Sequence, residues 1–376
     1  MFCNYRLIKL IKNIVKYFIV NVNIIIYTMK IEYGVKFDFQ DLLIKPKRSN
    51  LSSRSEVDLE REFTFLHSKR TWKGIPILSA NMDTTGTFEM YRELSKHKII
   101  TCLHKHYSIE EYPDDLNPNY YALGTGINQK DWIKLIALME KLNPYFLVID
   151  VANGYSSKFV NFCKKVREHY PKLTIIAGNV ATSDMVQELL LSAKVDIVKC
   201  GIGSGSVCST RLKTGVGYPQ ASVCMECSEV ANGLRGHIVS DGGCRLPGDV
   251  AKAFGAGAHF VMCGGMFSGH LESGGDLIED EDGNKFKTFY GMSSSLAQKK
   301  HHGGMASYRS SEGKIKKIPY KGSVKSTVMD LLGGMRSTGT YIGAQRLKDF
   351  PKCTTFIQVN RQVNEVYSHP LFNLKN

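Results

Sequence analysis

The chain of 376 residues is 43% hydrophobic and 22% charged, which is ordinary for a globular protein and excludes a largely disordered or fibrous chain. Its formal net charge of +14 suits anionic ligands such as nucleotides, but the basic residues are scattered rather than clustered, so we expect no nucleic-acid partner. The ten cysteines include several inside apolar runs and form no dense disulfide framework, which favours a reducing compartment and a cytoplasmic location.

The N-terminal segment, residues 1–28, is rich in Ile, Val, Asn and Lys. Its apolar part, 17–28, is too short to span a membrane and contains two asparagines. Two interpretations stay open: a targeting or anchoring segment, or translation upstream of a true start at Met29. We favour the second, because Met29-Lys-Ile-Glu leads directly into globular sequence. We therefore expect an extension at 1–28, one domain at 29–376, and no membrane contact unless the extension is a real anchor.

From residue 75 onward, short apolar and β-branched runs alternate with amphipathic segments. This alternation predicts parallel β-α units, and eight of them predict a closed (β/α)8 TIM barrel of the α/β class. An open doubly wound sheet is the alternative, but no Gly-x-Gly-x-x-Gly motif follows the first run. The expected strands are 76–81, 99–104, 120–126, 145–151, 173–179, 196–201, 237–241 and 259–264.

Two of the segments between these runs have a helical period. In the second of them, Ser156 stands at a capping position and Pro171 marks the end of the helix. The apolar faces consist of Trp132, Leu135, Met139 and Leu142 in the first segment, and of Phe159, Phe162, Val166 and Tyr170 in the second.

The loop after the sixth run carries a candidate nucleophile. Gly201-Ile-Gly-Ser-Gly-Ser-Val-Cys-Ser-Thr210 places Cys208 in a glycine-rich loop, with the hydroxyl of Thr210 two residues further on. A tight turn with a buried thiol is the alternative interpretation of this spacing. The carboxyl ends of barrel strands meet at one face, where the active site is built, and polar residues follow every expected strand here. That series favours the catalytic interpretation.

Glycine pairs follow the last two expected strands, as Gly242-Gly243 and Gly264-Gly265. In barrels this is the usual place for a phosphate, which backbone N–H groups hold. Simple turn glycines are the alternative. We expect these four residues to cradle a phosphate.

A long polar insertion, residues 269–320, follows the eighth expected strand. Such insertions are commonly lids or disordered segments. We expect the acidic run 279–282 to be a solvated hairpin tip, and His301-His302, which lack partners at ligand spacing, to lie on the surface. The segment 308–314 combines an arginine, a carboxylate and a glycine, and is a candidate for closing over a substrate.

Several of these motifs resemble the IMP dehydrogenase/GMP reductase family from about Met29 to the C-terminus. Within the family, segments 308–314 and 264–270 resemble the reductase branch, and the short connection after Tyr107 leaves no room for the regulatory pair that most IMP dehydrogenases insert. The residues that carry the resemblance are 38–48, 80–84, 150–155, 208–220, 240–243 and 291–293.

The resemblance implies NADPH-dependent conversion of GMP into IMP and ammonia. Cys208 would attack purine C2 and form a thioimidate, which hydride from NADPH then resolves; Thr210 with Glu312 would protonate the leaving ammonia. Ser204 and Ser209 depart from the residues common in the reductase branch, and neither is expected to touch the chemistry.

The resemblance also implies a homotetramer and a set of ligand contacts. The substrate contacts would be Ser206, Asp241, Gly242, Gly243, Gly264 and Gly265 for phosphate and ribose, and Gly291, Met292, Ser293, Arg309, Ser310 and Gly313 around the base. The cofactor contacts would be Lys105, Asp150, Val151, Ala152, Ile202, Gly203, Met292, Tyr308 and Arg309, with Ser53, Arg54, Ser337, Thr338, Gly339 and Thr340 from a neighbouring subunit. A potassium ion would lie on carbonyls of Gly203, Gly205 and Cys208, with Arg211 nearby.

Two other functions stay open. An IMP dehydrogenase without its regulatory domain would need an Arg-Tyr pair acting on water, and no clear Arg-Tyr dipeptide stands in the C-terminal part. A non-catalytic nucleotide- or RNA-binding barrel suits the basic charge, but the joint presence of Cys208, Thr210 and Glu312 argues against it.

Overall fold

The computed structural model describes residues 31–304, 306–308 and 310–360. The chain divides into two compact units, Met1–Val35 and Lys36–Asn376. The described residues of the first unit, 31–35, contain no helix or strand. The predicted extension, 1–28, lies outside the described residues, so its boundary stays a prediction.

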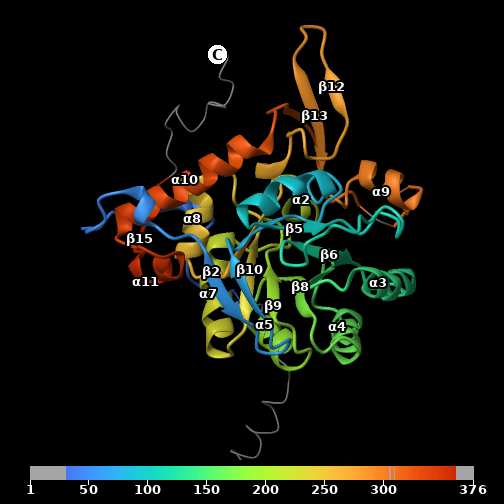
Figure 1. Ribbon diagram of the computed structural model, residues 1–376, viewed down its shortest axis with the longest axis horizontal. Helices are drawn as coiled ribbons and strands as arrows, with labels where there is room; N and C mark the ends of the chain where they lie inside the picture. The colour runs from blue at the N-terminus through green and yellow to red at the C-terminus, as the bar shows by residue number, and fades with distance from the viewer. Residues whose placement is uncertain (1–30, 305, 309, 361–376) are drawn as a thin grey trace, which may run out of the picture. The chain divides into compact units, whose positions relative to one another are not determined.

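Eight parallel strands of the second unit close into a barrel (Figure 1). Each strand pairs with its neighbour in the chain, and β11 pairs with β4, with Val261 opposite Ile77. The (β/α)8 prediction is therefore confirmed, and all eight expected strands are present. The strands are β4 (Ile77–Ser79), β5 (Ile100–Leu103), β6 (Tyr121–Thr125), β7 (Phe146–Asp150), β8 (Thr174–Val180), β9 (Ile197–Cys200), β10 (His237–Asp241) and β11 (Phe260–Cys263).

Helices cover the outside of the barrel, and their apolar faces pack against the strands. Both predicted helices are present: α4 is capped by Ser156, whose Oγ accepts from the N–H of Phe159 at 3.3 Å, and it ends before Pro171. The helices of the second unit are α2 (Phe88–Leu94), α3 (Gln129–Leu142), α4 (Ser157–His169), α5 (Ser183–Leu191), α6 (Thr210–Thr214), α7 (Gln220–Gly233), α8 (Pro247–Gly255), α9 (Ser295–His302), α10 (Val324–Ile342) and α11 (Phe350–Cys353).

A hairpin that precedes the barrel closes its N-terminal end. Strands β2 (Arg61–Thr64) and β3 (Thr71–Gly74) pair antiparallel, and the buried aromatic side chains of Phe63, Phe65 and Trp72 belong to the same core cluster as the inward-facing residues of the barrel strands. Phe63 stacks on Phe260 with ring centroids 4.5 Å apart. The sequence did not predict this plug.

The polar insertion after β11 contains regular structure. Strands β12 (Leu277–Glu279), β13 (Lys285–Tyr290) and β14 (Ile315–Pro319) form an antiparallel sheet, and the β12–β13 hairpin projects away from the barrel (Figure 1). The acidic run 279–282 lies at its exposed turn, as predicted. Near the ends of the unit, β1 (Leu42–Ile44) pairs with β15 (Phe356–Gln358).

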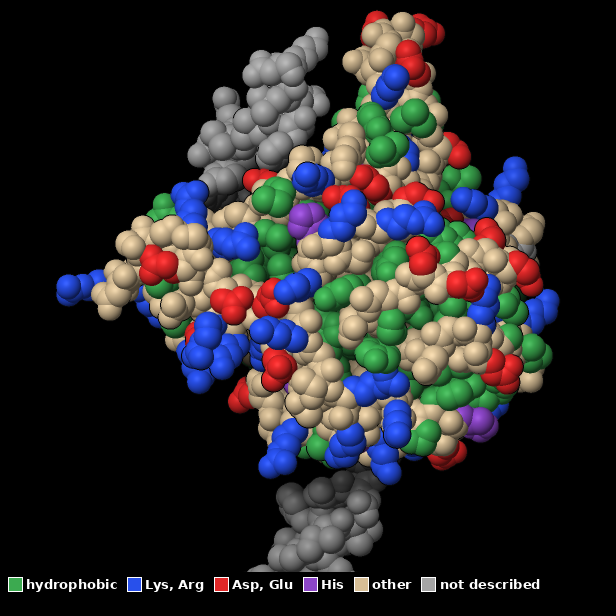
Figure 2. Space-filling model, viewed as in Figure 1, with side chains coloured by type: hydrophobic (Ala, Val, Ile, Leu, Met, Phe, Trp, Pro, Cys, Tyr) green, Lys and Arg blue, Asp and Glu red, His purple; other side chains and the backbone are tan. Residues whose placement is uncertain are grey.

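The basic residues are dispersed over the surface. Figure 2 shows Lys and Arg side chains spread over the visible face and interspersed with Asp and Glu. Within the described ranges, no helix has both the length and the apolar character that crossing a membrane requires.

Candidate active site

The loop between β9 and α6 presents Cys208 at the carboxyl end of the barrel. Glycines are needed here because the loop runs close to its neighbours: a Cβ on Gly201, whose φ is +151°, would stand 2.1 Å from the carbonyl oxygen of Asp241. Within the loop, the N–H of Cys208 donates to the carbonyl of Gly205 at 3.0 Å. Cys208 itself is half-buried, so a ligand that enters the site can reach its thiol.

Cys208, Thr210 and Glu312 form a continuous hydrogen-bonded chain. The Cys208 thiol donates to Thr210 Oγ1 at 3.2 Å, and the Thr210 hydroxyl donates to Glu312 Oε2 at 2.7 Å. Sequence alone could not place Glu312 here, because it is 102 positions from Thr210. The arrangement gives a proton a direct path from the thiol to a carboxylate.

Backbone contacts hold this chain together. The N–H of Ser209 donates to the carbonyl of Glu312 at 2.7 Å, and Lys314 donates to Val207 at 2.8 Å. Cys208 and Gly313 form an isolated antiparallel bridge. The segment that carries Glu312 is thus paired with the Cys208 loop, and it is also paired with the loop 291–294, where Gly291 donates to Lys314 at 3.1 Å. Three of the predicted base contacts, Gly291, Met292 and Ser293, therefore adjoin the candidate nucleophile.

The predicted phosphate-binding glycines meet the serines of the Cys208 loop. A Cβ on Gly242 would stand 2.5 Å from Ser204 Oγ, and one on Gly265 would stand 2.6 Å from Ser206 Oγ. Three successive strand ends, those of β9, β10 and β11, therefore converge here. The N–H of Gly243 already donates to the carbonyl of Ser204 at 3.0 Å, so in this arrangement that amide is not directed at a ligand.

Ser204, one of the two residues not expected to touch the chemistry, helps to hold the site. Its hydroxyl donates to the backbone carbonyl of Asp241 at 2.9 Å. The departure from the family pattern therefore places a hydrogen bond between the loop and the end of β10.

Two predicted ligand carboxylates share one buried lysine. Lys199 Nζ lies 2.6 Å from Asp150 Oδ1 and 2.7 Å from Asp241 Oδ2. Burial would raise the pKa of Asp150, but the charge and hydrogen bond of Lys199 outweigh it and hold that pKa below its ordinary value. Asn179 Nδ2 also donates to Asp241 Oδ2 at 2.8 Å, while its Oδ1 is buried without a hydrogen-bond partner among the described residues.

Arg211 fastens the Cys208 loop to the N-terminal part of the unit. Its guanidinium donates to both carboxylate oxygens of Asp38, at 2.8 and 3.3 Å, and to the carbonyl of Tyr218 at 2.6 Å. Its positive charge is therefore compensated beside the proposed potassium carbonyls of Gly203 and Gly205. Carbonyl oxygens are the donor type that hard cations take. Among the residues described, no group of three or more His, Cys, Asp or Glu side chains could hold a metal.

The predicted cofactor contacts fall into two places. Lys105, one-third exposed, lies 3.4 Å from Asp131 and acts electrostatically on Asp150, whereas Tyr308 is 85% exposed. Val151 and Ala152 follow β7, and Ile202 and Gly203 follow β9. Ser310, a predicted contact of the base, is exposed. The prediction for Arg309 falls outside the described residues. Lys105, Val151, Ala152, Ile202 and Gly203 thus follow barrel strands at the same end as Asp150.

The second place is the flank formed by α10 and the short helix Arg54–Glu56. Ser53 and Arg54 stand at the start of that short helix, and Ser337, Thr338, Gly339 and Thr340 belong to α10. The two elements are in contact. That these residues serve the cofactor of a neighbouring subunit stays a prediction.

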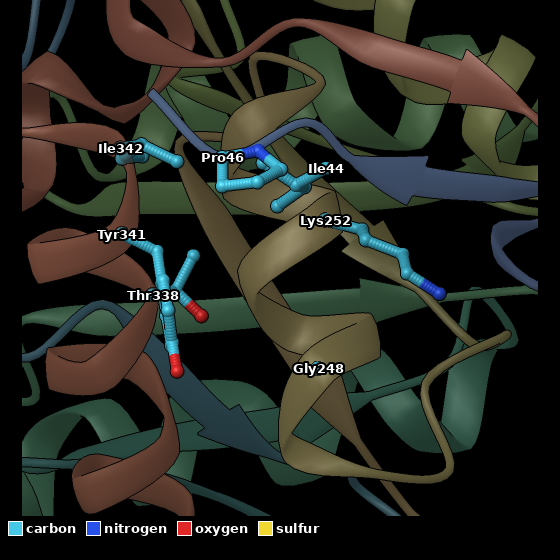
Figure 3. A pocket seen from close by; sticks show the side chains of 7 residues that line it. All are labelled: Ile44, Pro46, Gly248, Lys252, Thr338, Tyr341 and Ile342. Atoms are coloured by element: carbon cyan, nitrogen blue, oxygen red, sulfur yellow. The ribbon is translucent and has the colours of Figure 1, made fainter. Parts of the chain in front are cut away.

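A hollow of about 280 Å³ lies on this flank (Figure 3). Its position between β1, α8 and α10 separates it from the Cys208 loop, and none of its lining residues belongs to a barrel strand. It is lined by Ile44, Pro46, Gly248, Lys252, Thr338, Tyr341 and Ile342.

A second polar cluster, which the sequence did not predict, joins the insertion to the barrel. His301 was expected on the surface, but only 11% of its side chain is exposed, and its Nε2 lies 2.6 Å from Asp83 Oδ2. Tyr290 donates to the same oxygen at 2.6 Å, and the ring of His106 stacks on His301 at 3.6 Å. The expectation for His301 was wrong because its partner follows β4, far away in the chain. The side chain of His302 lies outside the described part.

Burial would raise the pKa of Asp83, but the hydrogen bonds from Tyr290 and His301 hold it below its ordinary value. Burial lowers the pKa of His106 to about 3. The cluster therefore presents an ionised carboxylate to α9, the helix that leads into the segment of Glu312. The sequence does contain one indication of this cluster, because Asp83 in the motif Asn81-Met-Asp83 is a carboxylate directly after an expected strand.

The chain is similar to known proteins over most of its length. Residues 36–369 match the family model described as the IMP dehydrogenase / GMP reductase domain. The chain is 56% identical to "GMP reductase" of Caenorhabditis elegans, over 90% of this chain and 96% of that protein. It is 55% identical to "GMP reductase 2" of Homo sapiens, over 90% and 98%, and 56% identical to "GMP reductase" of Phytophthora infestans, over 90% and 94%. The chain thus belongs to the IMP dehydrogenase/GMP reductase family.

Proposed function

We propose that this protein is a GMP reductase, an NADPH-dependent oxidoreductase of purine metabolism that converts GMP into IMP and ammonia. Relatives named GMP reductase, 55–56% identical over nine-tenths of the chain, support the reaction. The single observation that carries the chemistry is the chain from the Cys208 thiol through Thr210 to Glu312, with its two contacts of 3.2 and 2.7 Å. An IMP dehydrogenase is not favoured.

In the first half of the reaction, Cys208 Sγ forms a bond to C2 of the purine. The thiol proton moves to Thr210, and the proton of Thr210 moves to Glu312, so sulfur attacks as a thiolate. The bond from C2 to the exocyclic nitrogen then breaks. Glu312 then delivers its proton through the Thr210 hydroxyl to that nitrogen, which leaves as ammonia rather than as an amide anion.

In the second half, C2 gains a hydrogen and the bond to sulfur breaks. NADPH, when bound, would supply the hydride for this step. Cys208 leaves as the thiolate and recovers a proton that is taken up from solvent through Glu312 and Thr210, so this half needs no proton delivered to a leaving nitrogen. The role of Glu312 should therefore differ between the two halves.

The ligand contacts follow from the convergence of the strand ends. We assign the phosphate to Ser206 with the amides at Gly242, Gly264 and Gly265, with Gly243 joining if its bond to Ser204 opens. Asp241 would accept hydrogen bonds from the ribose hydroxyls, beside the unpartnered Asn179 Oδ1. The base would lie against Gly291, Met292, Ser293, Ser310 and Gly313, with Arg309.

The residues predicted for NADPH suit a dinucleotide. Lys105 offers a cation, Asp150 an ionised carboxylate and Tyr308 an exposed ring. We also propose a homotetramer, in which Ser53, Arg54 and 337–340 reach the cofactor of a neighbour, and a potassium ion on the carbonyls of Gly203, Gly205 and Cys208. The nine described cysteines are free thiols, which supports a cytoplasmic protein.

The test is incubation of the purified protein with GMP and NADPH. We expect NADPH loss matched by equal amounts of IMP and ammonia, and a faster rate in potassium than in sodium salts. With IMP and NAD, we expect no sustained formation of XMP. Sustained XMP formation without GMP turnover would make the protein an IMP dehydrogenase instead. Size measurement in solution tests the tetramer separately.

A further inference from the structure

Among the ion-paired cations described at the carboxyl end of the barrel, Lys199 is the most deeply buried. The mechanism above gives it no role. Its side chain is 4% exposed, in the middle of β9 among apolar residues. Burying an ammonium is costly unless the charge is paired. Here two carboxylates compensate it, Asp150 at 2.6 Å and Asp241 at 2.7 Å.

The two carboxylates come from different strands and face the ligand side of the barrel. Asp150 ends β7 and is 36% exposed, and Asp241 ends β10 and is 22% exposed. Lys199 reaches both from the strand that lies between β8 and β10. Without the ammonium of Lys199, the carboxylates of Asp150 and Asp241 would lie close together with no positive charge between them. Like charges at such a short distance repel.

The other charged and titratable groups around this cluster do not replace Lys199. Lys105 acts on Asp150 but lies beside Asp131. Asn81 and Asn179 donate to the carboxylates and carry no charge. The thiol of Cys102 is buried beneath the cluster, and burial raises its pKa, so it is neutral.

We propose that Lys199 is a positioning residue that holds Asp150 and Asp241 in one shared arrangement and thereby couples the cofactor side of the site to the ribose side. The inference rests on the proposed function for the identity of the two ligands. A ligand hydroxyl that orients one carboxylate changes the position of the shared ammonium. The ammonium then changes the position of the other carboxylate. Asp150 therefore influences GMP affinity although it is not assigned to GMP.

The test measures GMP binding by calorimetry, which needs no turnover, together with the KM for NADPH. In Lys199→Met we expect the dissociation constant of GMP and the KM for NADPH to rise together by about tenfold or more, because a hydrogen bond to a charged group is lost at both carboxylates. Lys252→Met is the matched control. Lys252 is largely buried beside Asp249 at 3.5 Å, and its replacement should leave both constants within twofold.

A double-mutant cycle separates coupling from a merely structural role. With Lys199 present, Asp150→Asn should weaken GMP binding, because the ammonium then pairs with Asp241 alone and pulls it out of place. With Lys199→Met, the same Asp150→Asn change should restore GMP binding in part, because it removes the uncompensated neighbour of Asp241. If Lys199→Met alone does not fold, the double variant Lys199→Met/Asp150→Asn, which keeps the net charge of the cluster, is used to measure GMP binding without Lys199.

Two results would overturn the proposal while leaving the proposed function intact. One is a Lys199→Met protein that melts at lower temperature but keeps both constants within twofold. The other is an Asp150→Asn change that weakens GMP binding equally with and without Lys199. Wild-type protein that binds no GMP would contradict the proposed function and this proposal together.

Discussion

The two ends of the barrel differ in what fills them. At the N-terminal end, Phe63, Phe65 and Trp72 pack among aromatic rings of the strands, and the Trp72 indole donates to the carbonyl of Asn119 at 2.8 Å. At the carboxyl end, Lys199 bridges two carboxylates and the thiol of Cys208 stands half-buried. The first end gains stability from apolar burial, whereas the second holds charges that cost free energy to bury.

This difference indicates a division of labour within one fold. A change at the aromatic end should lower the free energy of unfolding and leave the chemistry of the folded protein alone. A change at the charged end should alter ligand binding or turnover and change the free energy of unfolding less. Variants at each end test this contrast.

The largest effect is expected from Cys208→Ala. Loss of the nucleophile removes the covalent pathway, so GMP turnover should fall by several orders of magnitude. Calorimetry should still show GMP binding within a few-fold of wild type. Cys353→Ala, the same change at another half-buried cysteine, is the control and should keep full activity. A Cys208→Ala protein that retains a substantial part of the wild-type kcat would rule out covalent catalysis.

Phe65→Ala should mainly affect stability. Phe65 is fully buried and meets Phe146 edge-to-face at 5.9 Å, so its truncation should cost about 3–5 kcal/mol of unfolding free energy. Urea unfolding at fixed protein concentration measures this loss. Leu191→Ala, at an exposed position, should change it little. A Phe65→Ala enzyme that is as stable as wild type but slow in turnover would contradict the division between the two ends.

A smaller effect is expected from His237, whose ring packs against Phe63 and Phe65. Burial, with the charge of Arg61, lowers the pKa of His237 to about 4, below the value of about 6.5 in an unfolded chain. Well above pH 6.5 the residue is neutral in both states and contributes no pH dependence. As the pH falls from 6.5 towards 4, the unfolded chain takes up a proton that the folded chain excludes, so stability falls.

By pH 5 this loss should reach about 2 kcal/mol. In His237→Phe, the decrease in urea stability between pH 7.5 and pH 5 should therefore be smaller by about that amount, while other buried histidines keep part of it. His169→Phe, at an exposed position, should leave the decrease as it is in wild type. An unchanged decrease in His237→Phe would show that His237 becomes protonated inside the fold.

The sequence predicted the barrel because its signals are local. Each strand is a short apolar run, and each polar strand end lies directly after one. Cys208 and Thr210 also stand in one loop, so their proximity follows from spacing. Glu312 required the family resemblance, since no local pattern joins it to Thr210.

The parts that sequence reasoning missed depend on distant contacts. A lysine in an apolar run does not reveal its partners, and those of Lys199 are on β7 and β10. The sequence predicted His301 to lie on the surface, because its partner Asp83 is distant in the chain and is close only in the fold. The aromatic hairpin precedes the first barrel strand, and nothing in its sequence shows which end of the barrel it covers.

The central claim is that Glu312 delivers the proton that ammonia needs, while Cys208 forms and breaks the bond to C2. Glu312→Gln keeps the size of the side chain and removes its ionisable group. GMP turnover should fall by about 10²–10⁴-fold, the usual contribution of a general acid. IMP with NADP enters from the product side, where no nitrogen leaves, so reaching the thioimidate needs Glu312 only to take up the thiol proton and not to deliver a proton to ammonia. Rapid mixing of Glu312→Gln with IMP and NADP should therefore give a burst of NADPH that is reduced far less than GMP turnover. If the burst and GMP turnover fall by the same factor, Glu312 serves binding or structure, and its role in proton transfer is wrong.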